Sequence, residues 1–382
     1  MTHPRLVVAL GLGLAACGAA MPGGAGDDTP LTGLGRNVEP VSVRPAWRIE
    51  LTEGPVYRLR PHELASPAYS ALLDRVVVGS SGGEVVCVDA GNGAVLWRRS
   101  MGGAVSSTPV FDGRRVFLGT DDGGMVCLDA DSGEERWHYS VQGAVQQRPL
   151  LVDDAVVFVD GTNSIYAIGR ADGAWRWQYR RSAPVDFALA GEAKPTTDGR
   201  RIFAGFSDGH LVALDARDGA VSWTRDLAPE HDRFQDVDAA PVLIGGTLFA
   251  ASAATGVYAL SPEDGTVRFT VPVAGVNRLV EHEGALIASI DRGEVWRITV
   301  DGRVEWRTRL PGGAPSVAVS LGDVLAVSLS QGALHFLRAR DGRPMQRFLP
   351  GLGLAAPPSV GEDGGIYVLS NAGVLYALRP GA

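Results

Sequence analysis

One cassette recurs along this chain at intervals close to 40 residues. In its clearest copy an apolar run ends in Asp129, a turn closes on Gly133, and Trp137 follows four residues after that glycine. This order predicts a β-hairpin, because glycine supplies the positive φ of a tight turn and the aspartate can accept hydrogen bonds from turn amides.

Seven glycines hold the equivalent turn position: Gly93, Gly133, Gly173, Gly219, Gly265, Gly302 and Gly342. Their spacings are 40, 40, 46, 46, 37 and 40 residues. The residues four positions later are Trp97, Trp137, Trp177, Trp223, Phe269, Trp306 and Gln346. A period of this length in a strand-rich chain predicts a β-propeller, with one four-stranded blade per repeat.

The two ends of the chain supply one further blade. Seven complete repeats run from Glu63 to Pro350, and three strands follow within residues 355–379. The missing fourth strand, with its tryptophan, lies at residues 45–50. The sequence therefore predicts an all-β fold over residues 45–382: an eight-bladed β-propeller of four-stranded antiparallel blades, closed by pairing of the N- and C-terminal strands.

The second repeat shows how each blade divides into strands. The pattern predicts an inner strand over 104–112, followed by strands over 115–120, 125–130 and 134–140. The two middle strands are apolar at nearly every position, as expected for strands covered on both faces by neighbouring blades.

The first residues read as a targeting segment. Arg5 precedes a short apolar stretch over residues 6–14, and Leu14-Ala15-Ala16-Cys17 follows. This end resembles the bacterial lipobox, which implies a signal peptide over residues 1–16 and lipidation, including palmitate, at Cys17. An ordinary signal peptide with an incidental cysteine is the alternative. Residues 17–44 then form a flexible tether. Gly18 rather than Asp favours the outer membrane in enterobacterial lipoproteins.

Composition narrows the function classes. The formal charge of −8 argues against nucleic acid as a partner, since such surfaces are basic. Cys87 and Cys127 hold one repeat position in adjacent blades, too far apart for a disulfide, and we interpret both as buried small residues. The histidines lack metal-ligand spacing. We therefore expect no metal. Short matches to catalytic and dinucleotide-binding motifs lack the helix that such sites need, so we also expect no catalytic residue and no cofactor.

Three connections are longer than the others, and all join the last strand of one blade to the first strand of the next. They span residues 52–62, 181–194 and 227–238. Propeller topology places such connections on one face, and loops on a rigid scaffold commonly carry function. Asp236 and Asp238, which begin a strand beside these loops, are candidate binding residues; a solvated strand start is the alternative interpretation.

The cassette resembles the PQQ-like repeat, which quinoprotein dehydrogenases share with the BamB family of lipoproteins in the outer-membrane β-barrel assembly machinery. Two segments strengthen the resemblance to BamB. Residues 232–242 are similar to the family's D-R-L-x-D-V-D-x-x-P-V segment, and residues 187–197 to its L-x-L-R-G-x-x-x-P-T-T segment.

The resemblance implies that these two loops bind the periplasmic POTRA domains of a BamA-like partner. Phe187 and Leu189 would be the apolar contacts, and Asp236 and Asp238 the acidic ones. Ala190 stands where the family has arginine. The implied protein is a non-enzymatic scaffold, lipid-anchored in the cell outer membrane, facing the periplasm and associated with other assembly-complex lipoproteins.

Two alternatives stay open. The chain could serve as a scaffold in another envelope complex, since PQQ-like repeats are widely reused. It could also be a periplasmic dehydrogenase that uses PQQ and Ca²⁺. Such enzymes are usually longer and commonly carry a vicinal cysteine pair, which this sequence lacks.

Overall fold

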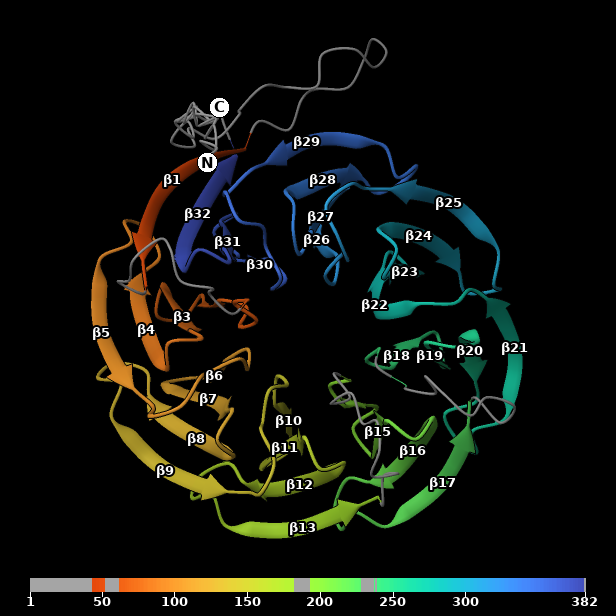
Figure 1. Cartoon of the computed structure of the whole chain (residues 1–382). Coiled ribbons are helices and arrows are strands. Elements are labelled where there is room, and N and C mark those ends of the chain that lie inside the picture. Colours follow the sequence, from red (N-terminus) through yellow and green to blue (C-terminus); the bar gives the residue numbers. More distant parts are fainter. Residues whose placement is uncertain (1–42, 52–61, 182–192, 228–236, 238, 381–382) are drawn as a thin grey trace, which may run out of the picture.

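The computed structural model of the chain describes residues 43–51, 62–181, 193–227, 237 and 239–380. These residues form thirty-two strands and no helix. The strands make eight four-stranded antiparallel sheets, arranged as blades around a central axis (Figure 1). The predicted eight-bladed β-propeller is confirmed.

Blades 1 to 4 follow one another along the chain. Blade 1 comprises β2 (Ala68–Ser70), β3 (Arg75–Gly79), β4 (Glu84–Asp89) and β5 (Val95–Ser100). Blade 2 comprises β6 (Val110–Asp112), β7 (Arg115–Thr120), β8 (Gly124–Asp129) and β9 (Glu135–Ser140). Blade 3 comprises β10 (Leu150–Val152), β11 (Ala155–Asp160), β12 (Ser164–Gly169) and β13 (Trp175–Arg180). Blade 4 comprises β14 (Thr196–Thr197), β15 (Arg201–Gly205), β16 (His210–Asp215) and β17 (Val221–Asp226).

Blades 5 to 7 continue in the same order, and blade 8 combines both ends of the chain. Blade 5 comprises β18 (Val242–Ile244), β19 (Thr247–Ser252), β20 (Gly256–Leu260) and β21 (Val267–Pro272). Blade 6 comprises β22 (Val276–His282), β23 (Ala285–Ile290), β24 (Glu294–Thr299) and β25 (Val304–Arg309). Blade 7 comprises β26 (Val319–Leu321), β27 (Val324–Ser328), β28 (Leu334–Arg338) and β29 (Pro344–Phe348). Blade 8 comprises β30 (Ser359–Val360), β31 (Ile366–Leu369), β32 (Val374–Pro380) and β1 (Val43–Glu50).

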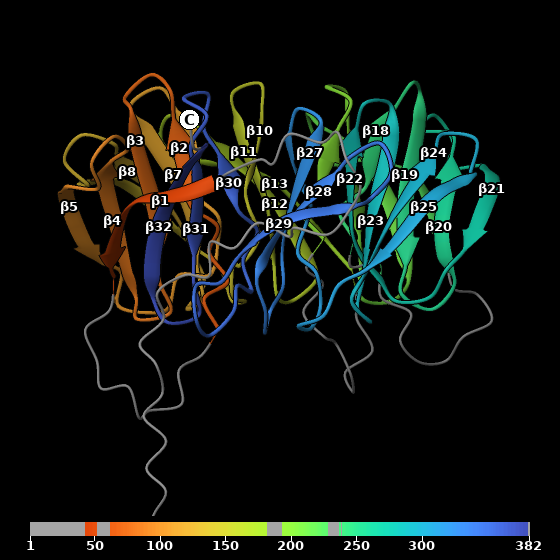
Figure 2. The same ribbon diagram turned by 90° about the horizontal axis from the view of Figure 1, so that it is seen from above.

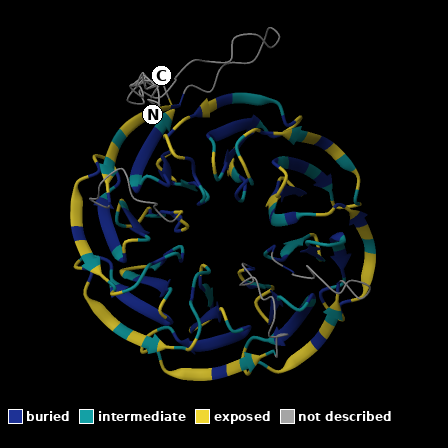
Figure 3. Ribbon diagram, in the orientation of Figure 1, coloured by how far each residue is buried: buried dark blue, intermediate teal, exposed yellow. Residues whose placement is uncertain are grey.

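Burial follows the position of a strand in its blade. The first strand of each blade lies nearest the axis and the fourth lies at the rim, and the blades form one layer when seen from the side (Figures 1 and 2). The middle strands β11 and β12 are buried at every residue, whereas the rim strand β13 is largely exposed (Figure 3). Because neighbouring blades cover both faces of the middle strands, these strands carry continuous apolar runs.

The repeated tryptophan connects a blade to the next one. Trp97 of blade 1 donates a hydrogen bond from Nε1 to the Ala130 carbonyl of blade 2, at 3.0 Å. Its ring lies on Gly133, where an added Cβ would come within 2.6 Å of the indole. Gly133 also has a φ of +73°. The turn therefore needs glycine both for its backbone and for this contact.

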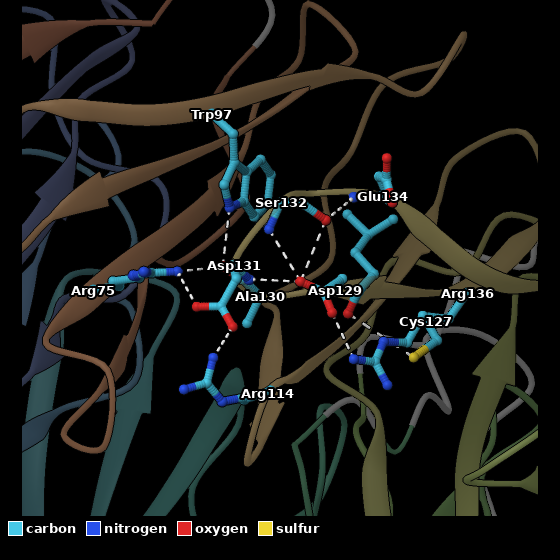
Figure 4. Close-up of polar contacts among 11 residues, drawn as sticks. Arg75, Trp97, Arg114, Cys127, Asp129, Ala130, Asp131, Ser132, Glu134 and Arg136 are labelled. Carbon is cyan, nitrogen blue, oxygen red and sulfur yellow. Dashed lines mark hydrogen bonds and ion pairs between the residues drawn. The ribbon is translucent and has the colours of Figure 1, made fainter.

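The turn aspartate acts as the hairpin pattern predicts (Figure 4). The Asp129 carboxylate accepts hydrogen bonds from the amides of Asp131 and Ser132, at 2.9 and 3.0 Å. Arg136 donates a further bond at 2.5 Å, and this bond contributes most to lowering the pKa of Asp129 to about 2. In the same turn, Asp131 pairs with Arg75 of blade 1 at 2.8 Å, which adds a polar link between blades.

Blade 8 is closed by antiparallel pairing of β1 with β32, from Val43 opposite Pro380 to Glu50 opposite Val374. The predicted pairing of the N- and C-terminal strands is thus confirmed. β32 lies between β31 and β1, so it holds the two ends of the chain in one sheet.

The inner strands are shorter than predicted. In blade 2 the strand covers Val110–Asp112 instead of 104–112. The preceding residues leave the sheet because the Val105 amide donates instead to the Ser80 carbonyl of blade 1, at 3.0 Å, and Pro109 has no amide hydrogen. The other three strands of this repeat agree with the prediction to within one residue.

Candidate partner-binding face and central channel

The residues predicted to bind a partner belong to the connections on either side of blade 4. Phe187, Leu189, Asp236 and Asp238 all lie outside the residues that the structure describes, and so does Cys17. The described residues that bound these connections nevertheless show how each connection is attached to the propeller.

The connection from blade 3 to blade 4 leaves from Arg181. The Arg181 amide donates a hydrogen bond to the Asn163 carbonyl at 3.1 Å, and its guanidinium pairs with Asp208 of blade 4. The chain is described again from Ala193, which is buried, and enters β14 through Lys194 and Pro195. This connection therefore begins and ends against blade 4.

The connection from blade 4 to blade 5 starts at the buried Leu227. The Leu227 amide donates to the Gly209 carbonyl at 3.0 Å, and the Leu227 carbonyl accepts a bond from the Tyr258 hydroxyl at 2.7 Å. One residue thus joins the turn before β16 of blade 4 to β20 of blade 5.

The same connection ends in a residue that belongs to the repeat. Val237 is fully buried, and its amide donates to the Phe206 carbonyl at 3.2 Å. Its side chain lies where a Cβ on Gly205 would clash. Val105 and Val145 make the equivalent contacts in blades 2 and 3. Val237, the residue between Asp236 and Asp238 in the sequence, therefore holds a core position of the repeat.

A cavity of about 820 Å³ occupies the central channel. In four consecutive blades a proline precedes the inner strand, and the residue before that proline lines the cavity; these residues are Thr108, Arg148, Lys194 and Ala240. A residue before proline is held in an extended conformation, so the repeat presents one side chain per blade at this level.

Two of these side chains carry charge. The side chains of Arg148 and Lys194 are exposed and face the channel, where the eight blades surround them. Burial lowers the pKa of Arg148. Burial also lowers the pKa of Lys194, and the positive charge of Arg148 adds to this effect. Neither residue is among those predicted from the sequence, although the recurrence of a residue followed by proline before several inner strands could have indicated them.

The described residues include no group of three or more His, Cys, Asp and Glu side chains that could hold a metal ion. Cys87 and Cys127 are buried and unpaired, as predicted, and burial raises their pKa values to about 12 and about 11.

No helix in the described part of the chain could cross a membrane.

Comparison with models of known protein families finds one that matches this chain. The model of the family described as outer membrane protein assembly factor BamB matches residues 81–301 and 241–381. This chain belongs to the BamB family. The match spans most of the propeller, from blade 1 to blade 8 of this BamB relative. A search of curated proteins finds no significant match.

Solved structures agree on the fold. BamB from Moraxella catarrhalis aligns with a TM-score of 0.75 at 24% identity, over 88% of this chain and 99% of that one. Quinohemoprotein alcohol dehydrogenase ADHIIG from Pseudomonas putida HK5 aligns with a TM-score of 0.69 at 13% identity, over 89% and 76%. The computationally designed Ika8 protein gives 0.69 at 14% identity, over 84% and 100%. At these identities the likeness concerns the fold alone.

Proposed function

We propose that this BamB-family protein is a non-enzymatic scaffold lipoprotein of outer-membrane protein assembly. In this proposal Cys17 carries the lipid, the propeller faces the periplasm, and the POTRA domains of a BamA-like protein bind the connections on either side of blade 4. Other lipoproteins of the same complex are further partners. The family match over most of the chain is the observation that carries the proposal.

The described anchors of the two connections support this use of blade 4. Leu227 and Val237 fix the second connection to core positions, and Arg181 and Ala193 bound the first. Both connections join a rim strand to the next inner strand, so propeller topology puts them on one face. Phe187 and Leu189 with Asp236 and Asp238 then offer apolar anchors beside acidic groups, a usual composition for a modest protein interface.

The test is the affinity for the soluble POTRA domains of the BamA-like partner. Phe187→Ala with Leu189→Ala should weaken binding at least ~30-fold, since truncating an anchor residue often costs about 2 kcal/mol or more. Asp236→Ala with Asp238→Ala should also weaken binding, and the loss should be larger at low salt because exposed charges are then less screened. Titration by calorimetry gives both values.

A control pair of substitutions distinguishes binding at this surface from non-specific hydrophobic association. Leu72 and Leu96 are exposed apolar residues in blade 1, and Leu72→Ala with Leu96→Ala should leave the affinity unchanged. Wild-type affinity in both test pairs, with intact circular dichroism, would refute the proposed face. Dye-linked alcohol oxidation by the purified protein with PQQ and Ca²⁺ would instead favour the dehydrogenase alternative.

A further inference from the structure

The charge of the channel wall is opposite to that of the whole protein. The chain carries a formal charge of −8, yet Arg148, Lys194 and Arg278 line the cavity. Glu362 is the one carboxylate among the described residues that line it. A positive, partly enclosed wall in an acidic protein attracts anions, because field lines concentrate in a cavity with low-dielectric walls.

Two of these cations have no carboxylate to neutralise them. Within the described residues, neither Arg148 nor Lys194 takes part in an ion pair or a side-chain hydrogen bond. The buried Arg201 of blade 4 differs, because it pairs with Asp198 at 2.7 Å. Both side chains of the channel pair, Arg148 and Lys194, are exposed to the channel, so an anion that enters the channel can reach them.

Lys194 is the single lysine among the 35 basic residues of the chain. It reaches the cavity from blade 4, and Arg148 reaches the cavity from the adjacent blade 3. Their charges are close enough for Arg148 to affect the pKa of Lys194.

Neutral donors complete this side of the cavity. Thr108 of blade 2 and Gln147 of blade 3 line it, and their side chains have no hydrogen-bond partner among the described residues. A hydroxyl and a side-chain amide can both donate to phosphate or carboxylate oxygens. A volume of about 820 Å³ suits a small molecule, and lies within the usual range for ligand cavities.

We propose that the central channel binds a small anion with two or more phosphate or carboxylate groups, held by Arg148 and Lys194. The planar Arg148 guanidinium can bind one acidic group through two parallel hydrogen bonds, and the Lys194 ammonium can neutralise a second. Thr108 and Gln147 would add neutral hydrogen bonds. This binding site is independent of the partner face proposed above.

The single lysine provides a direct test. In protein prepared without lipidation, an amine-reactive acetylating reagent modifies Lys194 and the α-amino group, and peptide mass spectrometry separates the two. Pyrophosphate and citrate, compared with sodium chloride at equal ionic strength, should slow acetylation of Lys194 and leave the α-amino group unaffected. Pyrophosphate and citrate represent the phosphate and carboxylate classes, and the stronger protector identifies the preferred group.

Variants assign the effect to the two cations. Arg148→Gln keeps the lysine for labelling and should raise the concentration needed for half-protection about tenfold or more, as expected for loss of a charged hydrogen bond. Lys194→Gln should weaken binding by a similar factor in calorimetry. Arg48→Gln with Arg340→Gln removes two charges from exposed positions outside the cavity and should leave protection unchanged.

Two results would overturn the proposal. One is equal acetylation of wild-type Lys194 with and without both anions at millimolar concentration, which needs no variant to interpret. The other is protection that Arg48→Gln with Arg340→Gln reduces as much as Arg148→Gln does, since the effect would then come from overall charge. Binding of the POTRA domains is measured separately, so failure of one proposal leaves the other intact.

Discussion

The side-chain amide of Gln346 bonds both backbone groups of Val43, with Oε1 2.9 Å from the amide nitrogen and Nε2 3.1 Å from the carbonyl oxygen. In the other repeats this position carries an aromatic ring that packs on the turn glycine of the next blade. Blade 8 has no such turn, because its rim strand β1 comes from the start of the chain. Glutamine therefore replaces tryptophan beside the closing strand.

The exception at Gln346 is visible in the sequence, but its reason is not. The repeat pattern locates the position, whereas the bond to Val43 joins residues 303 positions apart. The positions of Arg148 and Lys194 are likewise visible in the sequence, whereas the reason for their importance is not. In the sequence Arg148 and Lys194 are ordinary polar residues before proline, and only the closed ring brings them to one cavity.

A buried histidine makes stability depend on pH. His335 in β28 is 7% exposed, and burial, with a smaller contribution from Arg347, lowers its pKa to about 4 from 6.5. Below pH 6.5 the unfolded chain takes up a proton that folded His335 does not, so stability falls as the pH falls towards 4. Between about pH 7.5 and about pH 5.5 we expect a loss of roughly 1 kcal/mol from this residue.

Urea unfolding of wild type, His335→Gln and His138→Gln at the two pH values measures this contribution. The His335→Gln variant should lose less stability on acidification than wild type. His138 is exposed on the rim strand β9, and its variant should behave as wild type. An identical pH dependence in all three proteins would contradict the assignment.

Blades are the elements of this fold, and the tryptophan contacts between them differ in one respect. Trp306 of blade 6 donates to the Ala339 carbonyl of blade 7 at 2.9 Å. Trp137 of blade 2 packs on Gly173 of blade 3 in the same way, but its buried Nε1 has no acceptor among the residues that the structure describes. The two sites thus form a natural comparison of one contact with and without its hydrogen bond.

Trp306→Phe should lower the free energy of unfolding by about 1 kcal/mol more than Trp137→Phe, because only the first change breaks a hydrogen bond and leaves a carbonyl unpaired. Urea denaturation of both variants gives the difference. Equal losses would mean that ring packing alone joins the blades.

At this scale the sequence predicts some strands better than others. The middle and rim strands of blade 2 match because their apolar patterns reflect burial within the repeat. The inner strand was predicted too long because the Val105 amide bonds Ser80 of another blade, a contact that no local pattern encodes. The partner-binding residues came from a family resemblance, and Phe187, Leu189, Asp236 and Asp238 remain a prediction.

The stability of the whole propeller depends on blade 8, the sheet that joins both ends of the chain. Deleting residues 371–382 removes β32, which lies between β31 and β1. Both neighbours then lose their hydrogen bonds, and we expect a loss comparable with the whole ~5–15 kcal/mol stability of a typical domain. Thermal melting followed by circular dichroism should show no cooperative transition near that of wild type.

Deletion of residues 381–382 alone is the control, since β32 ends at Pro380. An unchanged cooperative melt of the longer deletion would show that seven blades are stable without the eighth.

The origin of β1 has a consequence for assembly. A strand that completes a sheet from the opposite end of its chain can complete the same sheet in a second molecule, and reciprocal exchange would leave all eight blades of both molecules intact. Covalent linkage gives β1 an effective concentration on the order of millimolar for its own β32. Monomers therefore prevail in dilute solution, and domain-swapped dimers become favoured only when the protein is concentrated beyond that level.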